Sequence, residues 1–203
     1  MNTGDTAFMM ICAALVFFMT PGLAFFYGGL VRRKNVCNTI MACVAIMGLS
    51  VVMWTLFGYS LSFGGNHAGI IGDFRWFGLN GVGMEAGPYA DSIPHLVFCA
   101  FQMMFAMITP ALITGSLVGR MKFKALFLFV AIWSVIVYYP MTHMVWGDGG
   151  FLAAIGSVDF AGGDVVHISS GISALVLAII LGRRRGYEHT TYRIHNIPSV
   201  VLG

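Results

Sequence analysis

Long apolar stretches recur along this chain, separated by shorter polar segments. An α-helix rises 1.5 Å per residue, so about 20 apolar residues cross a hydrocarbon core of roughly 30 Å. Five stretches reach that length, near Thr6–Val31, Asn38–Phe63, Ile93–Leu117, Ala125–Val145 and Phe160–Leu181. A sixth begins at "IPSVVLG", at the end of the given sequence. The pattern predicts an all-α, polytopic membrane helix bundle with five transmembrane helices and the start of a sixth.

Composition agrees with a chain built for lipid. Apolar residues make up 58% and charged residues 9% of the 203, whereas soluble domains carry about 25% charged residues. We therefore expect residues 1–203 to form a single transmembrane domain. The first stretch lacks a basic n-region and outlasts a signal-peptide core, so we interpret it as a retained span. The cysteines show no disulfide or metal spacing and are predicted to be small apolar fillers: Cys12, Cys37, Cys43 and Cys99.

The basic residues predict the orientation. Ten of the eleven Lys and Arg residues fall in three clusters, each after an odd-numbered span: Arg32–Lys34, Arg120–Lys124 and Arg183–Arg193. The positive-inside rule then makes these loops cytoplasmic and the N-terminus external. Seven of the eight acids, all but Glu188, fall toward the outer side, and Arg75 is the one basic exception. The net charge of +3 thus reflects topology, and it indicates no nucleic-acid partner.

One external loop, Gly64–Ser92, is long and rich in glycine. It also contains "FRWF", an aromatic and basic run that a floppy linker does not need. Long loops without regular structure are uncommon unless they are functional. We expect this loop to form a folded cap on the outer face.

The stretch "DFAGGDVVHIS", Asp159–Ser169, begins the fifth span with three ionisable side chains. At a helix N-terminus the carboxylate of Asp159 can accept hydrogen bonds from the unpaired backbone N–H groups. His167 lies seven residues beyond Phe160, which corresponds to about 10 Å into the membrane. A histidine at that depth is costly unless it faces a cavity or a partner. Two interpretations stay open, a core histidine bonded to a carbonyl and a functional one.

Aromatic residues occur at a similar depth on other helices. Phe101 and Phe105 are four residues apart and share one face of the third helix. Trp146 ends the fourth span and reaches the outer surface. The Phe pair fits ordinary core packing, and Trp146 fits an interface anchor. The alternative for Trp146 is an aromatic face presented to a cation.

Three motifs carry a resemblance: "PGLAFFYGGLVRRKN" in the first span, "HMVWG" closing the fourth, and "DFAGG" followed by "VVHI" in the fifth. In this order they resemble the ammonium transporter family (Amt/Mep, related to Rh proteins), along the whole chain. The resemblance implies the first of two inverted five-helix repeats, within a protomer of about eleven spans that assembles as a homotrimer. We therefore expect the sequence to be the first half of such a protein.

The resemblance also implies roles for individual residues. Trp146, Phe101 and Asp159 would recruit ammonium at the outer mouth, Phe105 would be the gate below, and His167 would line a hydrophobic pore. A second histidine, a second gating phenylalanine and a hydroxyl group would come from the other repeat. Because a bare cation has a very large self-energy in a dry pore, ammonium would release its proton and pass as ammonia. The imidazole of His167 can accept or relay that proton.

The resemblance further implies a multi-pass protein of the cell membrane that is not an enzyme and needs no cofactor. Its substrates would be ammonium, ammonia and methylammonium, and a PII-type regulatory protein would dock on the cytoplasmic face. An ammonium sensor with the same fold and an added signalling domain is the closer alternative. A membrane metalloenzyme is a remote one, since no HExxH or comparable spacing accompanies its candidate ligands, His143, Asp148, Asp159, Asp164 and His167.

Three positions near the outer mouth need separate interpretation. Asp164 stands where the family usually has threonine, and α-helical spacing puts it on the face of His167 at i, i+3. It is expected either to modulate that imidazole or to be solvated in the vestibule. Asp148 interrupts the glycine run after Trp146 and fits an exposed turn better than a source of negative potential at the mouth. For His143 we expect only local hydrogen bonding.

Overall fold

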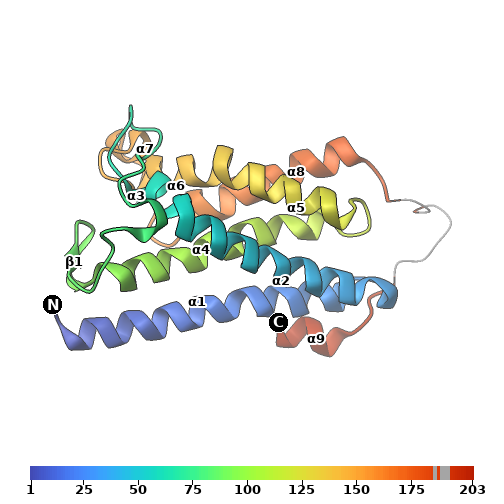
Figure 1. The fold of residues 1–203 in the computed structure, drawn as a ribbon. Helices are drawn as coiled ribbons and strands as arrows, with labels where there is room; N and C mark the ends of the chain where they lie inside the picture. Colours follow the sequence, from blue (N-terminus) through green and yellow to red (C-terminus); the bar gives the residue numbers. More distant parts are fainter. Residues whose placement is uncertain (185–186, 188–192) are drawn as a thin grey trace.

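The computed structural model describes residues 1–184, 187 and 193–203. Within this part of the chain, five helical rods are long and apolar enough to cross a membrane: Thr3–Leu30, Arg33–Phe63, His95–Leu117, Phe123–Ala154 and Gly163–Leu181. They run side by side along the length of the molecule (Figure 1). The five predicted spans are confirmed, with ends that differ by a few residues. The largest difference that bears on the site is the fifth span, which begins at Gly163 rather than Phe160.

The first two spans differ in regularity. α1 (Thr3–Leu30) is one helix, capped by the side chain of Asn2, which accepts the backbone N–H groups of Gly4 and Asp5. The second span combines a short 3-10 turn and three helical pieces, η1 (Arg33–Asn35), α2 (Val36–Met53), the π-helical turn η2 (Trp54–Gly58) and α3 (Tyr59–Phe63). The π-helical turn changes the helical register, so α3 presents different side chains from those a continuous α-helix would present.

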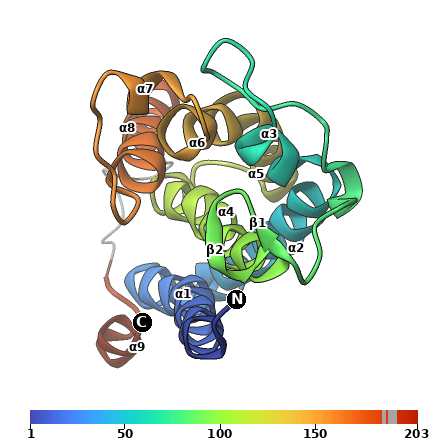
Figure 2. The same ribbon diagram turned by 90° about the vertical axis from the view of Figure 1, so that its left-hand side faces the viewer.

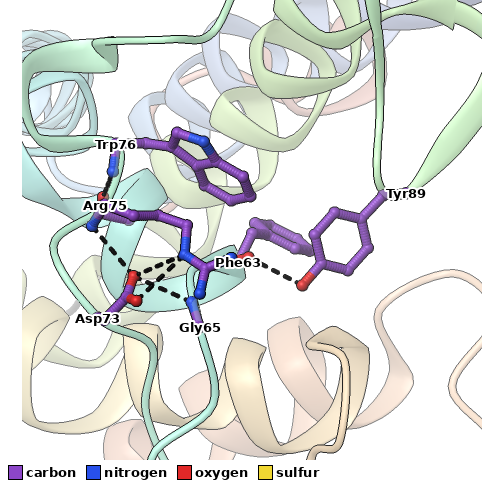
Figure 3. A network of polar contacts seen from close by, with 7 residues as sticks. Phe63, Gly65, Asp73, Arg75, Trp76 and Tyr89 are labelled. Carbon is purple, nitrogen blue, oxygen red and sulfur yellow. Dashed lines mark hydrogen bonds and ion pairs between the residues drawn. The ribbon is translucent and has the colours of Figure 1, made fainter.

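The loop after α3 is folded, as the sequence predicts. It contains η3 (Phe77–Leu79) and an antiparallel pair of short strands, β1 (Ala86–Gly87) and β2 (Ala90–Pro94). Asp73 organises the loop by accepting hydrogen bonds from the backbone N–H groups of Gly65 and Arg75, both at 3.0 Å, and from the Arg75 side chain (Figure 3). Burial raises the pKa of Asp73, but these donors and the guanidinium charge outweigh it, so the pKa lies below its ordinary value.

The third span lies among the other spans. α4 (His95–Leu117) packs against α1, α2 and α8 and is surrounded by the other spans in the end-on view (Figure 2). The remaining elements are α5 (Phe123–Trp133), the π-helical turn η4 (Ser134–Tyr138), α6 (Tyr139–Trp146), α7 (Phe151–Ala154), the π-helical turn η5 (Gly163–Ile168), α8 (Ser169–Leu181) and α9 (Ile197–Leu202). α9 is the predicted start of a sixth span, and it packs against α1.

Glycine lets helices approach closely in this core. The position of a Cβ on Gly58 would lie 2.6 Å from the ring of Tyr139, and one on Gly115 would lie 2.6 Å from the ring of Tyr27. Close backbone approach at small residues is a main source of packing energy between membrane helices, because lipid removes the usual hydrophobic drive. Trp54 and Tyr139, both buried, pack with their rings 6.1 Å apart beside the Gly58 contact.

The basic clusters meet at one end of the bundle, which we call the basic end. The position of a Cβ on Gly119, in the second cluster's loop, lies 3.8 Å from atoms of both Arg184 and Asn35. The N-terminus and the β1–β2 hairpin lie at the opposite, outer end (Figure 1). This is the arrangement that the positive-inside rule requires. Arg185 and Glu188, which belong to the third predicted cluster, lie outside the described residues. The four cysteines are free thiols.

Candidate functional site

The turn before α8 is built around Asp159. Its Oδ1 accepts the backbone N–H groups of Gly162 and Gly163 at 2.6 and 2.8 Å, and its Oδ2 accepts those of Asp164 and Val165 at 2.8 and 2.9 Å. Gly162 has φ 93°, a left-handed conformation that glycine adopts without strain. The side chain therefore satisfies four N–H groups at the start of the helix, which is the capping role that the sequence predicts.

These hydrogen bonds also hold Asp159 in its charged form. Burial raises the pKa of the carboxyl group, but the four backbone donors outweigh burial, so the pKa lies below its ordinary value of 3.8. A carboxylate at the positive end of the helix dipole is stabilised further. The outer mouth thus carries a negative charge throughout the physiological pH range.

The backbone of Asp159 positions Trp146. The indole Nε1–H of Trp146 donates a 3.0 Å hydrogen bond to the carbonyl oxygen of Asp159. Trp146 is the last residue of α6, and it is half-buried rather than projecting freely into an interface. Trp146 consequently connects the end of α6 to the turn at the start of the fifth span.

A chain of ring contacts extends inward from Trp146. The ring of Phe105 lies 5.9 Å from that of Trp146 in an edge-to-face arrangement, and the ring of Phe101 lies 5.1 Å from that of Phe105. Phe101 and Phe105 do share one face of α4, as their spacing predicts. The family resemblance implied Phe101 beside Trp146 and Phe105 below, and the structure gives Phe105 a direct ring contact with Trp146.

Below this ring chain, His167 lines two cavities. One, of about 260 Å³, is also lined by Phe105, Leu23 and Phe26. The other, of about 480 Å³, continues toward the basic end and is lined by Tyr27, Ser170 and Arg184, among others. The two cavities share His167 and Leu112. The exposed imidazole therefore borders both cavities.

The depth that the sequence predicts for His167 is too large. Because the fifth span starts at Gly163, His167 lies four residues along the helix, and the axial rise is at most about 6 Å rather than 10 Å. The turn is also π-helical, since the N–H of His167 donates to the carbonyl of Gly162, five residues back. Such turns are rare and occur frequently at functional sites.

The predicted shared face of Asp164 and His167 loses its basis in α-helical spacing. That expectation depended on α-helical spacing, and η5 is a wider π-helical turn in which residues three apart diverge. Asp164 accepts a 2.8 Å hydrogen bond from the hydroxyl of Ser157, in the loop that precedes the fifth span. The carboxylate of Asp164 thus holds that loop to the start of the fifth span by a hydrogen bond.

His143 and Asp148 connect the mouth to the outer cap. The buried His143 contacts the carbonyl oxygen of Ser62 through Nδ1 at 3.1 Å and Oδ1 of Asn66 through Nε2 at 3.3 Å, so its hydrogen bonding reaches a distant segment. Asp148 is exposed, as expected of a turn, and its N–H donates to the hydroxyl of Tyr89 at 3.1 Å.

Tyr89 is a residue that sequence reasoning missed. Its hydroxyl donates to the carbonyl oxygen of Phe63 at 2.9 Å (Figure 3). Its ring stacks on Phe98 of α4 with an interplanar angle of 4°. Burial raises its pKa above the ordinary value and outweighs the hydrogen bond from the backbone N–H of Asp148, which lowers the pKa. Tyr89 therefore joins α3, α4 and the end of α6, and no periodicity marks it because it lies in a loop.

Over residues 1–184, 187 and 193–203, no group of three or more His, Cys, Asp or Glu side chains gathers closely enough to hold a metal ion. The five candidate ligands named from the sequence have the contacts described above: one caps a helix, three make hydrogen bonds to loops, and one lines the cavities.

The fold defines a class of protein: a multi-pass helical membrane protein, in which Phe105 contacts Trp146 and lines a cavity together with His167. The model of the Ammonium Transporter Family matches residues 7–203, and the chain belongs to that family. It is accordingly a multi-pass protein of the plasma membrane.

Individual relatives agree with this assignment. An ammonium transporter of Bacillus subtilis is 49% identical over 203 residues, which cover 100% of this chain and 49% of the relative. A crystal structure of Saccharomyces cerevisiae Mep2 superposes with a TM-score of 0.83 at 33% identity, over 97% of this chain and 46% of that one. A structure titled "Sensor Amt Protein" matches with a TM-score of 0.83 at 29% identity, over 96% and 49%. The chain thus spans about half the length of the relatives it matches.

Proposed function

We propose that this protein is an ammonium transporter that recruits ammonium at an outer aromatic site, removes a proton and conducts ammonia along a path lined by His167. The observation that carries the proposal is that Phe105 both contacts the ring of Trp146 and lines a cavity together with His167. Family membership supports the choice of ammonium as the transported species.

Recruitment depends on attraction to the aromatic rings and on a fixed negative charge. An ammonium ion losing its water is stabilised by the face of Trp146, with Phe101 contributing to the ring cluster. The carboxylate of Asp159 favours a cation at the mouth, and its carbonyl oxygen holds the indole in place. Phe105 is the gate between this site and the cavity below.

Below the gate, a charged species is strongly disfavoured. Moving a bare cation into an apolar passage costs far more than moving a neutral molecule, so ammonium gives up one proton and continues as ammonia. Alkali cations have no proton to release and are rejected on the same ground. The imidazole of His167, exposed to both cavities, accepts or relays the proton.

The test compares two substitutions at Trp146 in methylammonium uptake by cells that lack other ammonium transporters. Both Trp146→Leu and Trp146→Phe remove the N–H donor to Asp159, but only leucine removes the aromatic face. We expect Trp146→Leu to raise the half-saturation concentration roughly tenfold and Trp146→Phe to change it by no more than about threefold. An unchanged value in Trp146→Leu, or equal losses in both variants, would contradict aromatic recruitment.

An ammonium sensor is the second candidate, because the chain also resembles a structure titled as a sensor. Proteoliposomes separate the two functions. Uptake of labelled methylammonium into vesicles containing the purified protein supports transport. Ammonium binding without any uptake would support sensing and would overturn the transport proposal.

Two partner proposals accompany the function. We propose a homotrimer, to be checked by the mass of the purified protein in detergent, where a monomeric mass would contradict it. We also propose that a PII-type regulator docks on the basic end, which is the cytoplasmic face. Pull-down with PII proteins from nitrogen-sufficient cells tests this, and failure to retain any PII protein would remove the proposal.

A further inference from the structure

Residues 147–150 form the turn that follows Trp146, and we call it the mouth turn. It is held by the outer cap. The N–H of Asp148 donates a 3.1 Å hydrogen bond to the hydroxyl of Tyr89. The same hydroxyl donates at 2.9 Å to the carbonyl oxygen of Phe63, the last residue of α3 (Figure 3). Through one hydroxyl group, the mouth turn is therefore joined to the outer end of the second span.

Asn66 holds the mouth turn from another segment of the cap. Its Nδ2 donates to the carbonyl oxygen of Gly149 at 2.9 Å, and its Oδ1 accepts the N–H of Gly69 at 2.6 Å. These two partners determine the orientation of the amide, because the flipped amide would place donor against donor and acceptor against acceptor. Oδ1 also lies 3.3 Å from Nε2 of His143, which precedes Trp146 by about one helical turn on α6. The cap thus contacts the chain on both sides of Trp146.

The mouth turn depends on these outside contacts for its conformation. Three of its four residues are glycine, the residue with the greatest backbone freedom, so the turn has few side chains of its own to restrict it. Gly149 has φ 71°, and a Cβ there would collide with Nδ2 of Asn66. A Cβ on Gly150 would collide with the carbonyl oxygens of His143 and Met144. Glycine is therefore required for the close approach, and the hydrogen bonds from the cap select one conformation of the turn.

The position of this turn matters because Trp146 immediately precedes it. Trp146 is the last residue of α6, so its backbone is restrained by the helix on one side and by the mouth turn on the other. Its indole donates to the carbonyl oxygen of Asp159 at 3.0 Å and contacts the ring of Phe105 at 5.9 Å. Attraction of a cation to an aromatic ring also depends on the distance and direction of the ring face. A loosened mouth turn would therefore weaken a cation site at Trp146.

We propose that Asn66 and Tyr89 are positioning residues of the recruitment site: by holding the mouth turn, they fix Trp146 and so set the affinity for ammonium. This inference rests on the proposed role of Trp146 in recruitment. Neither residue lines the two cavities that His167 borders. Their loss therefore changes the half-saturation concentration, while the maximal rate, which depends on the path below, stays the same. The long outer cap acquires a function in this way.

The experiment measures methylammonium uptake against concentration by the full-length protein in cells that lack other ammonium transporters. Tyr89→Phe removes the hydroxyl and keeps the ring that stacks on Phe98. Asn66→Ala removes the second contact at an exposed position, where substitution disturbs packing least. Asn80→Ala is the matched control, because Asn80 is exposed in the same cap and its side chain makes no hydrogen bond to the described residues.

We expect Tyr89→Phe and Asn66→Ala each to raise the half-saturation concentration about threefold, because the hydrogen bonds that they remove have modest net strength. Asn80→Ala should stay within about 1.5-fold of the parent. Maximal rates, normalised to the amount of protein in the membrane, should match that of the parent. The decisive readout is coupling to the indole. In a Trp146→Leu background, Tyr89→Phe should cause no further increase, since the ring that it positions is gone.

Several outcomes would overturn the inference and leave aromatic recruitment standing. One is a parent-like half-saturation concentration in both cap variants, or a loss confined to their maximal rates. Another is an equal increase in Asn80→Ala, which would mean that any change in the cap has this effect. A third is an equal effect of Tyr89→Phe with and without the indole of Trp146. An unchanged Trp146→Leu variant, by contrast, would remove aromatic recruitment itself and this inference with it.

Discussion

At the scale of single residues, Asp159 combines two contacts that the sequence does not connect. Its carboxylate accepts four backbone N–H groups at the start of the fifth span, and its carbonyl oxygen accepts the indole N–H of Trp146. Any change at Asp159 that moves the turn will therefore also move Trp146. This coupling makes Asp159 a positioning residue for the aromatic mouth as well as a source of negative charge.

The hydrogen-bond geometry predicts graded effects of two substitutions. Each carboxylate oxygen of Asp159 accepts two N–H groups, and Asp159→Asn keeps only one oxygen, so two of the four N–H groups lose their acceptor. We expect Asp159→Asn to reduce the free energy of unfolding by about 1–3 kcal/mol and Asp159→Ala to reduce it more. Thermal unfolding in detergent measures both. Parent-like stability of Asp159→Asn would contradict the bonding described here, and full methylammonium flux in that variant would show that the charge is unnecessary.

The lowered pKa of Asp159 also predicts a pH dependence. The unfolded carboxyl group titrates near 3.8 and the folded one below that, so the unfolded state binds more protons between the two values. The stabilising contribution is present above pH 3.8 and is lost as the pH falls through the folded pKa. Below pH 3.8 the parent should lose stability more steeply than Asp159→Asn, as measured by unfolding temperature against pH. Parallel curves would contradict this.

Asp164 calls for a different test. Its contact with Ser157 indicates a structural role, and the π-helical turn removes the shared face with His167. We expect Asp164→Thr to leave the midpoint of flux against pH unchanged, because threonine keeps a hydroxyl group for Ser157. A shift of the midpoint by about half a pH unit or more would restore the sequence-based hypothesis that Asp164 acts on the imidazole.

At the scale of elements, the π-helical turns and close glycine contacts determine how the rods pack. Gly58 ends the η2 turn, where the ring of Tyr139 occupies the space that a Cβ would need. We expect Gly58→Ala to reduce the free energy of unfolding by about 1–3 kcal/mol through overpacking. Gly48→Ala is the matched control, because Gly48 lies in the same span with nothing within 4 Å of its Cβ position. Equal stabilities of the two variants would contradict the close packing of these rods.

At the scale of the whole molecule, broad apolar surfaces stay uncovered. On α1 the exposed side chains include Phe8, Leu15 and Phe18, and on α8 they include Leu175 and Ile179. These faces require lipid or further protein around them. α8 continues the span that carries His167. Whatever covers the exposed apolar side chains of α8 therefore also bears on the proposed ammonia path.

Orientation is testable through a natural cysteine. Cys37 is exposed near the basic end, and Glu85 is exposed in the outer cap. We expect a membrane-impermeant maleimide to label Glu85→Cys in intact cells and to leave Cys37 unlabelled until the membrane is opened. Labelling of Cys37 in intact cells would reverse the proposed orientation.

The spans and their direction follow from the sequence, because both depend on local quantities. Apolar length determines whether a segment can cross a membrane, and the position of Arg32–Lys34 or Arg120–Lys124 determines which end stays inside. Capping by Asp159 was also predictable, since the acceptor and the N–H groups are neighbours in the chain. Even the face shared by Phe101 and Phe105 needed only their spacing on one helix.

Contacts between distant segments were decided by the tertiary structure. The ring of Phe105 contacts Trp146, the Asp159 carbonyl oxygen accepts the indole N–H, and Tyr89 joins the outer cap to the end of α6. The π-helical turn at Gly163–Ile168, which separates Asp164 from His167, has no distinct pattern in the sequence. Each of these depends on how whole helices pack, because a small rotation or one extra residue in a turn changes which side chains meet. Sequence spacing specifies neighbours within a helix, and only packing specifies neighbours between helices.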